Sequence, residues 1–124
     1  MLNKLKCLLI LNRKKFNRKI DANDITMELI EELEKQGAII IDVRSPQEFE
    51  EGHLRNAICI PDYEIMQKIE EVVPDKEQTI IVYCSSGYRS KKIQKKLENR
   101  GYTKLYNLYN GIENYWDFFL YMLK

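Results

Sequence analysis

The chain has 124 residues, a formal net charge of +1 and 31% charged residues. This is the composition of a soluble globular protein and a length sufficient for one domain with a core, but not for two. No run of the sequence approaches the roughly 20 apolar residues that a membrane-spanning helix requires. The three cysteines are widely spaced and there is a single histidine, His53, so we expect neither a metal site nor a disulfide framework. Reduced thiols, no cofactor and a cytoplasmic location are the default expectations for such a chain.

The charge is distributed unevenly, which predicts a boundary near the start of the chain. Residues 1–20 carry seven basic residues and no acidic one, whereas residues 21–124 contain all 19 acidic residues against 13 basic ones. We therefore expect a basic N-terminal extension over residues 1–22 and a folded domain over residues 23–124. The extension also contains scattered leucines, so it either packs on the domain or makes peripheral contact with an anionic membrane or an acidic partner.

Along the folded part, short β-branched and aromatic runs alternate with stretches of helical period. Strands are expected at 38–41, 57–60, 79–83 and 103–106. Helices are expected at 26–37, 47–51, 62–72 and 90–97, and again after residue 111. The apolar residues that this last helix is expected to bury are Ile112, Tyr115, Trp116, Phe119, Leu120 and Met122. The alternation is typical of an α/β domain with a mainly parallel sheet, in which ligands bind beyond the carboxyl ends of the strands.

Residues with known preferences for helix ends mark several of these boundaries. Thr26 is the N-cap candidate of the first helix, and Gly37 stands where a C′ residue belongs. Ser45 and Pro46 begin the second helix. Gly101 ends the helix that starts near residue 90.

The segment after the strand at 79–83 carries the strongest signal for chemistry. Cys84 opens the loop Cys84-Ser85-Ser86-Gly87-Tyr88-Arg89-Ser90, and a helix follows. The N–H groups at a helix N-terminus and the charge of Arg89 both favour a thiolate, and Gly87 permits the positive φ that a tight loop needs. We therefore predict that Cys84 is a nucleophile in a cradle of backbone amides, which would also hold an anionic group bonded to its sulfur. The alternative is a buried structural thiol, which is also the expectation for Cys59 in its apolar strand.

Four stretches, in this order along the chain, resemble the single-domain rhodanese-like proteins, a family of sulfurtransferases. Residues 41–49 look like the family pattern I-D-V-R-x-x-x-E-[FY], and residues 51–61 look like E-G-H-I-x-x-A-x-x-[IL]-P. Residues 84–90 look like the catalytic C-x-x-G-x-R-S loop, and residues 101–102 and 110–116 look like the late G-[YF] and G-G-I-x-x-W patterns. The resemblance implies an α/β fold with a five-stranded, mainly parallel sheet flanked by helices on both faces.

The resemblance also implies a reaction. Cys84 would be the catalytic residue, which accepts a sulfane sulfur from a donor such as thiosulfate or a persulfide and then carries it as a persulfide. The acceptor would be a small thiol, cyanide or a sulfur-carrier protein. The residues expected to bind the transferred sulfur are Ser85, Ser86, Gly87, Tyr88, Arg89 and Ser90. The residues expected to support the site structurally are Asp42, Arg44 and His53.

Two turns depart from the family pattern. Arg55-Asn56 stands where the family commonly has proline and glycine, so we expect that turn to differ. Asn110 replaces the first glycine of G-G-I. Because asparagine tolerates the left-handed region better than most residues, we expect this second turn to survive.

Two other functions stay open at this point. A phosphatase or arsenate reductase of the same fold also uses a cysteine, an amide cradle and an arginine, but such enzymes have a loop that is one residue longer than the six residues from Cys84 to Arg89. A non-catalytic binding module of the family would usually lack the cysteine. The aromatic residues near the C-terminus are expected to close the core, and no nucleic-acid partner is expected.

Overall fold

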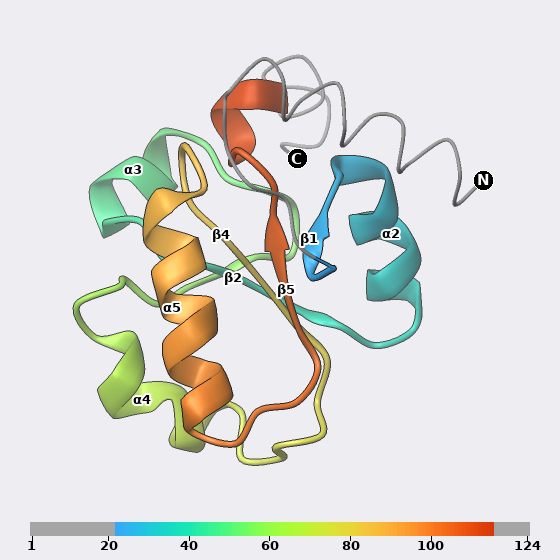
Figure 1. Ribbon diagram of the computed structural model, residues 1–124. Coiled ribbons are helices and arrows are strands. Elements are labelled where there is room, and N and C mark those ends of the chain that lie inside the picture. Colours follow the sequence, from blue (N-terminus) through green and yellow to red (C-terminus); the bar gives the residue numbers. More distant parts are fainter. Residues whose placement is uncertain (1–21, 116–124) are drawn as a thin grey trace.

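Five parallel strands form the central sheet of the domain in the computed structural model, which describes residues 22–115 (Figure 1). The strands are β1 (Asp24–Ile25), β2 (Ile39–Asp42), β3 (Ile58–Cys59), β4 (Ile80–Tyr83) and β5 (Leu105–Leu108). Their order across the sheet is β1-β5-β4-β2-β3, and each neighbouring pair is parallel. This confirms the expected α/β class and the five-stranded sheet that the resemblance implied.

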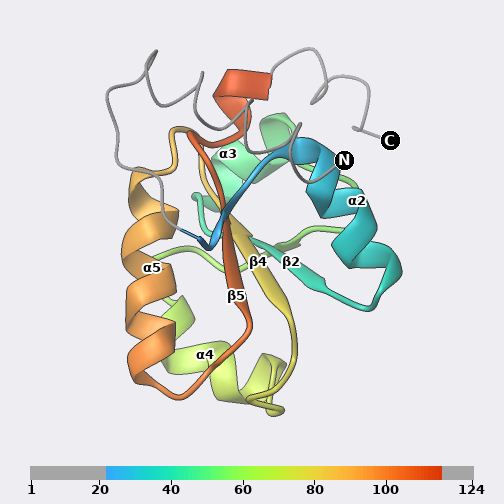
Figure 2. The ribbon, with the colours of Figure 1, turned by 45° about the vertical axis from the view of Figure 1, so that its right-hand side comes forward.

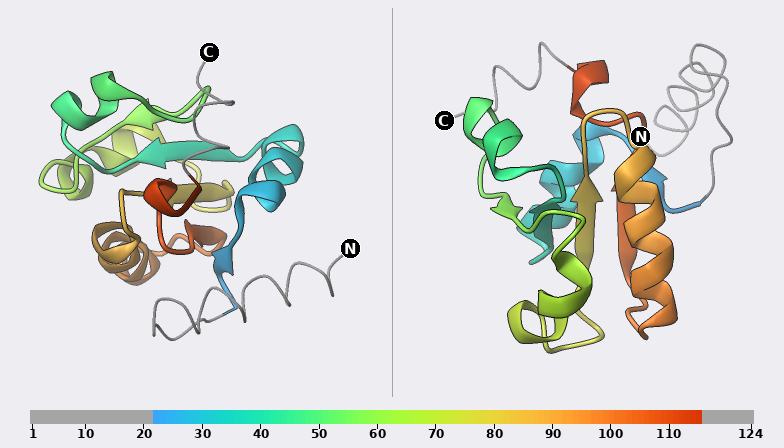
Figure 3. Two further views of the ribbon diagram at one scale, coloured as in Figure 1. Left: turned by 90° about the horizontal axis from the view of Figure 1, so that it is seen from above. Right: turned by 90° about the vertical axis from the view of Figure 1, so that its left-hand side faces the viewer.

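The helices are α2 (Met27–Lys35), α3 (Pro46–Glu51), α4 (Ile65–Val72) and α5 (Tyr88–Asn99), followed by the short 3₁₀ helix η1 (Ile112–Tyr115). Figure 2 shows α4 and α5 on one face of the sheet and α2 on the other. Helix α3, η1 and the loop between β4 and α5 gather at the carboxyl ends of the strands (Figure 3, right), the end at which α/β folds bind ligands. Within the described residues, no helix is both long and apolar enough to cross a lipid bilayer.

The central strand β4 is buried along its whole length, and its side chains alternate between two apolar clusters. Ile80 and Val82 belong to the cluster that contains residues of α4 and α5, whereas Ile81 and Tyr83 belong to the cluster on the side of α2. Cys84 continues the alternation and joins the first cluster. Because burial of one large apolar side chain contributes about 1.5–3 kcal/mol, packing on both faces fixes the end of β4 from which Cys84 starts its loop.

Helix α3 begins where the sequence predicts. Ser45 Oγ accepts the N–H of Glu48 at 3.2 Å, and the Glu48 carboxylate accepts the N–H of Ser45 at 3.1 Å in return. Pro46 lies in the first turn, where the missing N–H has no helical acceptor to lose. Such a reciprocal cap contributes roughly 1 kcal/mol, and it also fixes the direction of the Glu48 side chain.

The predicted start of α5, near residue 90, lies two residues too late. The helix begins at Tyr88 with Gly87 as its N-cap, so Ser90 lies inside the first turn. Gly87 has φ +91°, a conformation that suits a residue without Cβ. Gly87 thus turns the chain from the loop directly into the helix. Local helix propensity alone does not indicate that the helix begins at this residue.

Other predicted boundaries are corrected by contacts between distant segments. The first strand, β1, was not predicted, because two residues carry no recognisable period. Strand β5 lies two residues later than the predicted strand at 103–106, since Leu108 pairs with Ile25 of β1. Helix α4 begins at Ile65 and not near residue 62.

The sequence also placed Cys59 wrongly. This residue lies in β3, a two-residue strand at the edge of the sheet, and it is partly exposed. Because β3 has a single neighbouring strand, β2, its other edge is not covered by the sheet. The apolar run at 57–60 therefore does not lead to full burial of Cys59. The predicted extension before residue 22 and the predicted burial of residues 116–122 lie outside the described residues.

Candidate active site

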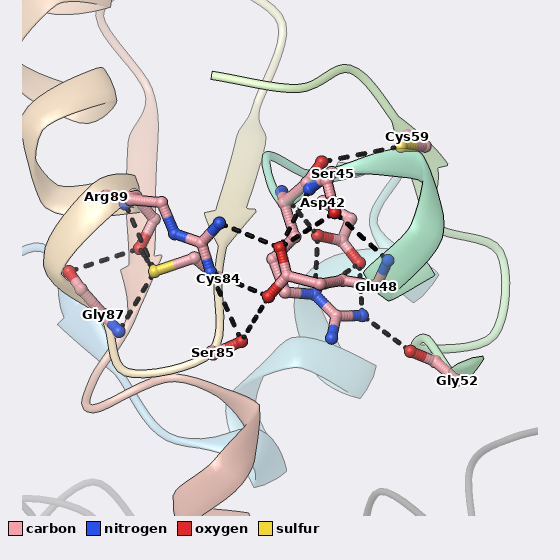
Figure 4. Close-up of polar contacts among 11 residues, drawn as sticks. Asp42, Ser45, Glu48, Gly52, Cys59, Cys84, Ser85, Gly87 and Arg89 are labelled. Carbon is pink, nitrogen blue, oxygen red and sulfur yellow. Dashed lines mark hydrogen bonds and ion pairs between the residues drawn. The ribbon is translucent and has the colours of Figure 1, made fainter. Parts of the chain in front are cut away.

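The sulfur of Cys84 lies within the loop between β4 and α5. The residue is 1% exposed. Its Sγ accepts the backbone N–H groups of Gly87 at 3.1 Å and of Ser90 at 3.4 Å, and the thiol donates to Ser90 Oγ at 3.4 Å (Figure 4). Two N–H donors aimed at one atom stabilise negative charge on it. The fold therefore brings two of the predicted loop amides, from Gly87 and Ser90, to the predicted nucleophile.

The exposed side chains of the loop mark its outer rim. Ser86 and Tyr88 are exposed, Tyr88 by 61%, so both side chains lie on the outer surface of the loop. Lys92 follows one turn later on α5, and its Nζ lies 4.5 Å from the centre of the Tyr88 ring.

The N–H groups of Tyr88 and Arg89 belong to the first turn of α5 and so have no acceptor within the helix. They remain suited to bind an anion beside the sulfur.

The turn before η1 supports the cysteine loop from behind. Ile112 N–H donates to the Cys84 carbonyl at 3.0 Å, and Glu113 N–H donates to the Ser85 carbonyl at 3.1 Å. Gly111 has φ +72°, and a Cβ at this position would overlap both of those carbonyl groups. The preceding Asn110 adopts φ +62°, so the left-handed turn survives the replacement of glycine, as expected.

Arg89 does not point its guanidinium at the sulfur as an unpaired charge. Its two terminal nitrogens donate to the two carboxylate oxygens of Glu48 at 2.9 and 3.0 Å, which makes a two-pronged ion pair between α5 and α3 (Figure 4). The hydrogen bond from Arg89 is the largest cause that lowers the pKa of Glu48 to about 2. The same hydrogen bond raises the pKa of Arg89 above its ordinary value.

Glu48 also reaches the loop directly. Ser85 Oγ donates to Glu48 Oε2 at 3.2 Å and accepts from Arg89 Nη2 at 3.4 Å. Two residues of the cysteine loop are therefore tied to α3 through one carboxylate. Sequence reasoning gave Glu48 no role, although it stands at the glutamate position of the I-D-V-R-x-x-x-E-[FY] pattern, which was the available signal.

Asp42 and Arg44 form a buried ion pair at the end of β2. Arg44 Nε lies 3.0 and 3.1 Å from the two Asp42 oxygens, and Nη2 lies 2.8 Å from Oδ2. Burial disfavours the guanidinium charge, but the hydrogen bond and the charge of Asp42 outweigh it and raise the pKa of Arg44. Arg44 Nη2 also donates to the carbonyl of Gly52 at 2.6 Å. The pair thus joins β2 to the C-terminal end of α3.

His53 and Tyr83 hold the segment that follows α3. The ring of His53 stacks on Phe49 with 3.7 Å between centroids, and Nδ1 lies 2.8 Å from the Phe49 carbonyl. The Tyr83 hydroxyl accepts the N–H of Leu54 at 3.0 Å, and burial followed by the nearby charge of Asp42 raises the pKa of that hydroxyl. None of the hydrogen bonds of His53 within the described part of the chain involves the cysteine.

The turn at Arg55-Asn56 also forms without proline or glycine. Asn56 adopts φ +69°, and its Nδ2 donates to Glu34 Oε2 of α2 at 2.8 Å.

Within residues 22–115, no group of three His, Cys, Asp or Glu side chains is placed to hold a metal ion.

Comparison with known proteins identifies a matching family and several relatives of this chain. Residues 26–117 match the family described as rhodanese-like domain. The chain is 40% identical over 67 residues to thiosulfate sulfurtransferase PspE of Escherichia coli. This match covers 54% of this chain and 64% of PspE. It is 30% identical over 89 residues to thiosulfate sulfurtransferase GlpE of Coxiella burnetii, covering 72% of this chain and 81% of the relative.

Among solved structures, a rhodanese with anions from E. coli has a TM-score of 0.58 at 35% identity, and the match covers 63% of this chain and 91% of that one. The chain spans slightly less than two thirds of the length of PspE. The family match, by contrast, extends over most of the domain and includes every motif of the site. This chain therefore belongs to the rhodanese-like domain family.

Proposed function

We propose that the protein is a sulfurtransferase that carries a sulfane sulfur as a persulfide on Cys84. The observation that supports this most directly is the pair of N–H groups, from Gly87 and Ser90, directed at a buried sulfur. Two relatives named thiosulfate sulfurtransferase, PspE and GlpE, support the reaction class.

The chemistry takes place in two displacement steps. The Cys84 thiolate attacks the outer sulfur of thiosulfate, the S–S bond of thiosulfate breaks, and sulfite leaves with its electron pair. The outer sulfur of the resulting persulfide then lies beside the N–H groups of the first turn of α5, which suit an anion. A thiolate, a cyanide ion or the thiol of a carrier protein attacks that sulfur, and the bond to Cys84 breaks to return the thiolate.

The arginine argues against the phosphatase alternative. A phosphoryl group presents several charged oxygens, and the guanidinium fork is the usual way to bind them. Here Glu48 occupies both terminal nitrogens of Arg89. A single sulfur atom needs fewer donors, and the backbone N–H groups of the loop can supply them.

Intact mass spectrometry tests this proposal. After incubation with thiosulfate and removal of the donor, the wild-type protein should gain the mass of one sulfur atom and lose it when cyanide is added. Cys84→Ser should gain none. Cys59→Ser is the matched control and should gain the sulfur as the wild type does. A wild-type protein that takes up no sulfur from thiosulfate or a small persulfide, but hydrolyses a phosphate ester, would reject the proposal.

A further inference from the structure

A buried polar chain leads from the Cys84 sulfur to the far edge of the sheet. Ser90 Oγ accepts from the Cys84 thiol at 3.4 Å and donates to Asn107 Oδ1. Asn107 Nδ2 donates to Asp24 Oδ1 at 3.1 Å, and Lys91 Nζ lies 3.0 Å from the same oxygen. The three residues beyond the sulfur, Ser90, Asn107 and Asp24, are each no more than 3% exposed.

The carboxylate at the end of this chain fixes the orientation of the amide. An ionised carboxylate accepts hydrogen bonds and donates none. Asn107 must therefore turn its NH₂ group toward Asp24, and its carbonyl oxygen must face Ser90. The backbone keeps the two side chains next to each other, because Asp24 and Asn107 are paired residues of the neighbouring strands β1 and β5 (Figure 1).

The orientation of the amide decides where the single hydroxyl proton of Ser90 goes. Three acceptors surround Ser90 Oγ when Cys84 is ionised: the sulfur, the carbonyl of Gly87 at 3.4 Å and the carbonyl of Asn107. The Gly87 carbonyl also accepts the N–H of Lys91 at 3.1 Å, and its contact with Ser90 Oγ is longer than the contact of Asn107 Oδ1 with the same hydroxyl. Asn107 is thus the main partner that competes with the sulfur for the Ser90 proton.

We propose that Asp24 and Asn107 are positioning residues that hold the Ser90 hydroxyl away from the Cys84 thiolate. The sulfur then keeps two N–H donors and lacks a third donor from the hydroxyl. A thiolate with fewer hydrogen bonds is less populated at a given pH, but each thiolate is a stronger nucleophile. The inference rests on the proposed function, in which Cys84 is the attacking group.

Alkylation of Cys84 by iodoacetamide across a pH series tests the proposal without any sulfur donor. All variants carry Cys7→Ser and Cys59→Ser, so that only Cys84 reacts. Asn107→Leu removes the competing acceptor at similar size and unchanged charge, which frees the hydroxyl for the sulfur. The pH midpoint of the alkylation rate should fall by about 1 unit, and the plateau rate at high pH should fall about threefold.

Asp24→Asn is a second test that keeps the size of the side chain. Without the carboxylate, the Asn107 amide can turn its NH₂ group toward Ser90, whose proton then becomes available to the sulfur. The pH midpoint of the Cys84 alkylation rate should again fall. This change also removes a negative charge, so both variants are repeated with Ser90→Ala, where the hydroxyl effect is absent and only the charge effect remains. Lys91 loses its ion pair with Asp24 in this variant, and the Ser90→Ala background measures the effect of that change of charge as well. The Arg89–Glu48 pair and Asp62 stay unchanged.

The expected pattern is a lowered midpoint in Asn107→Leu that disappears in the Ser90→Ala background. A folded Asn107→Leu protein with an unchanged or raised midpoint overturns the proposal, and so does a shift that persists without the hydroxyl. If Asn107→Leu does not fold, the difference between Asp24→Asn with and without Ser90 decides the question by the same criteria. Alkylation that shifts as expected in a protein that forms no persulfide rejects the proposed function alone.

Discussion

Cys84 and Cys59 lie at the carboxyl ends of two different strands and differ in almost every physical respect. Cys84 follows the central strand β4 and is 1% exposed, yet its sulfur accepts two backbone N–H groups. Cys59 lies in the edge strand β3 and is partly exposed, and its thiol donates to the carbonyl of Arg44 at 3.8 Å. Burial, followed by the charge of Asp42, raises the pKa of the Cys59 thiol. The polarity of the neighbouring groups, more than solvent exposure, therefore distinguishes the two sulfurs.

The largest expected effect comes from breaking the support behind the Cys84 loop. In Gly111→Ala the new Cβ overlaps the carbonyl groups of Cys84 and Ser85, so the loop must move. Sulfur transfer should fall by roughly 10²-fold, as expected when a reacting atom is displaced by about 1 Å.

Gly37→Ala is the control for this change. Gly37 also has a positive φ, but a Cβ there meets nothing within 4 Å. Its cost is the backbone strain alone, roughly 1–2 kcal/mol of stability, with transfer rates near the wild-type value in the folded protein. Equal transfer rates in the two variants would contradict the role given to the turn before η1. Thiocyanate formation from thiosulfate and cyanide, together with thermal melting, measures both effects.

Arg89→Lys should have the next largest effect, because it keeps the charge and loses the two-pronged contact with Glu48. A lysine offers one nitrogen in place of the fork that holds both carboxylate oxygens, so the loop loses part of its attachment to α3. We expect transfer to fall by roughly tenfold, or about 1.4 kcal/mol in the barrier. Because the pair is about one-third exposed, its net contribution to stability should stay within about 1 kcal/mol.

Glu48→Gln identifies the origin of that loss. If the ion pair acts by holding the loop, this variant should lose transfer to a similar degree, and the double variant should lose little more than either single one. Fully additive losses in the double variant would mean that Arg89 acts on the sulfur independently of Glu48.

Cys59 allows a smaller but direct test of the contrast between the two sulfurs. Because burial and Asp42 raise its pKa, the thiol should react with iodoacetamide at pH 7 more slowly than a free cysteine in solution. The measurement uses Cys84→Ser with Cys7 also replaced, so that only Cys59 can be alkylated. Cys59→Ser should leave sulfur transfer within about twofold of wild type, as for most substitutions away from a site. A large loss of transfer would show that the edge of the sheet takes part in the reaction.

The expected effect on acid stability is confined to low pH, and Glu48 determines its direction. The hydrogen bond from Arg89 lowers the pKa of Glu48 in the folded protein from its ordinary 4.5 to about 2, so folding favours the ionised form. The contribution of Glu48 to stability is therefore complete above pH 4.5 and is lost as the pH falls toward 2. Wild type should be more stable than Glu48→Gln by about 1 kcal/mol at pH 6, and the difference should shrink between pH 4.5 and 2. A difference in denaturant midpoint that stays constant over this range would contradict the pairing.

The amide loop around Cys84, the fold class and several helix ends could be predicted from the sequence because each depends on residues that are close together in the chain. A cysteine after a buried strand, followed by glycine and arginine, specifies a strand, a tight loop and a helix within seven residues. The cap at Ser45 and Pro46 involves one helical turn, and the left-handed turn at Asn110 depends on the tolerance of one residue type for positive φ.

The features that only the tertiary structure determines are contacts between residues that are distant in sequence. Arg89 and Glu48 are 41 positions apart, and Asn107 of β5 reaches Ser90 of α5. Strand β1 is two residues long and exists because β5 offers it a free edge. The partial exposure of Cys59 follows from the position of β3 at the rim of the sheet. Local preferences of the chain are weak and cannot specify strand order, so these contacts appear only when the sheet brings the carboxyl ends of its strands together.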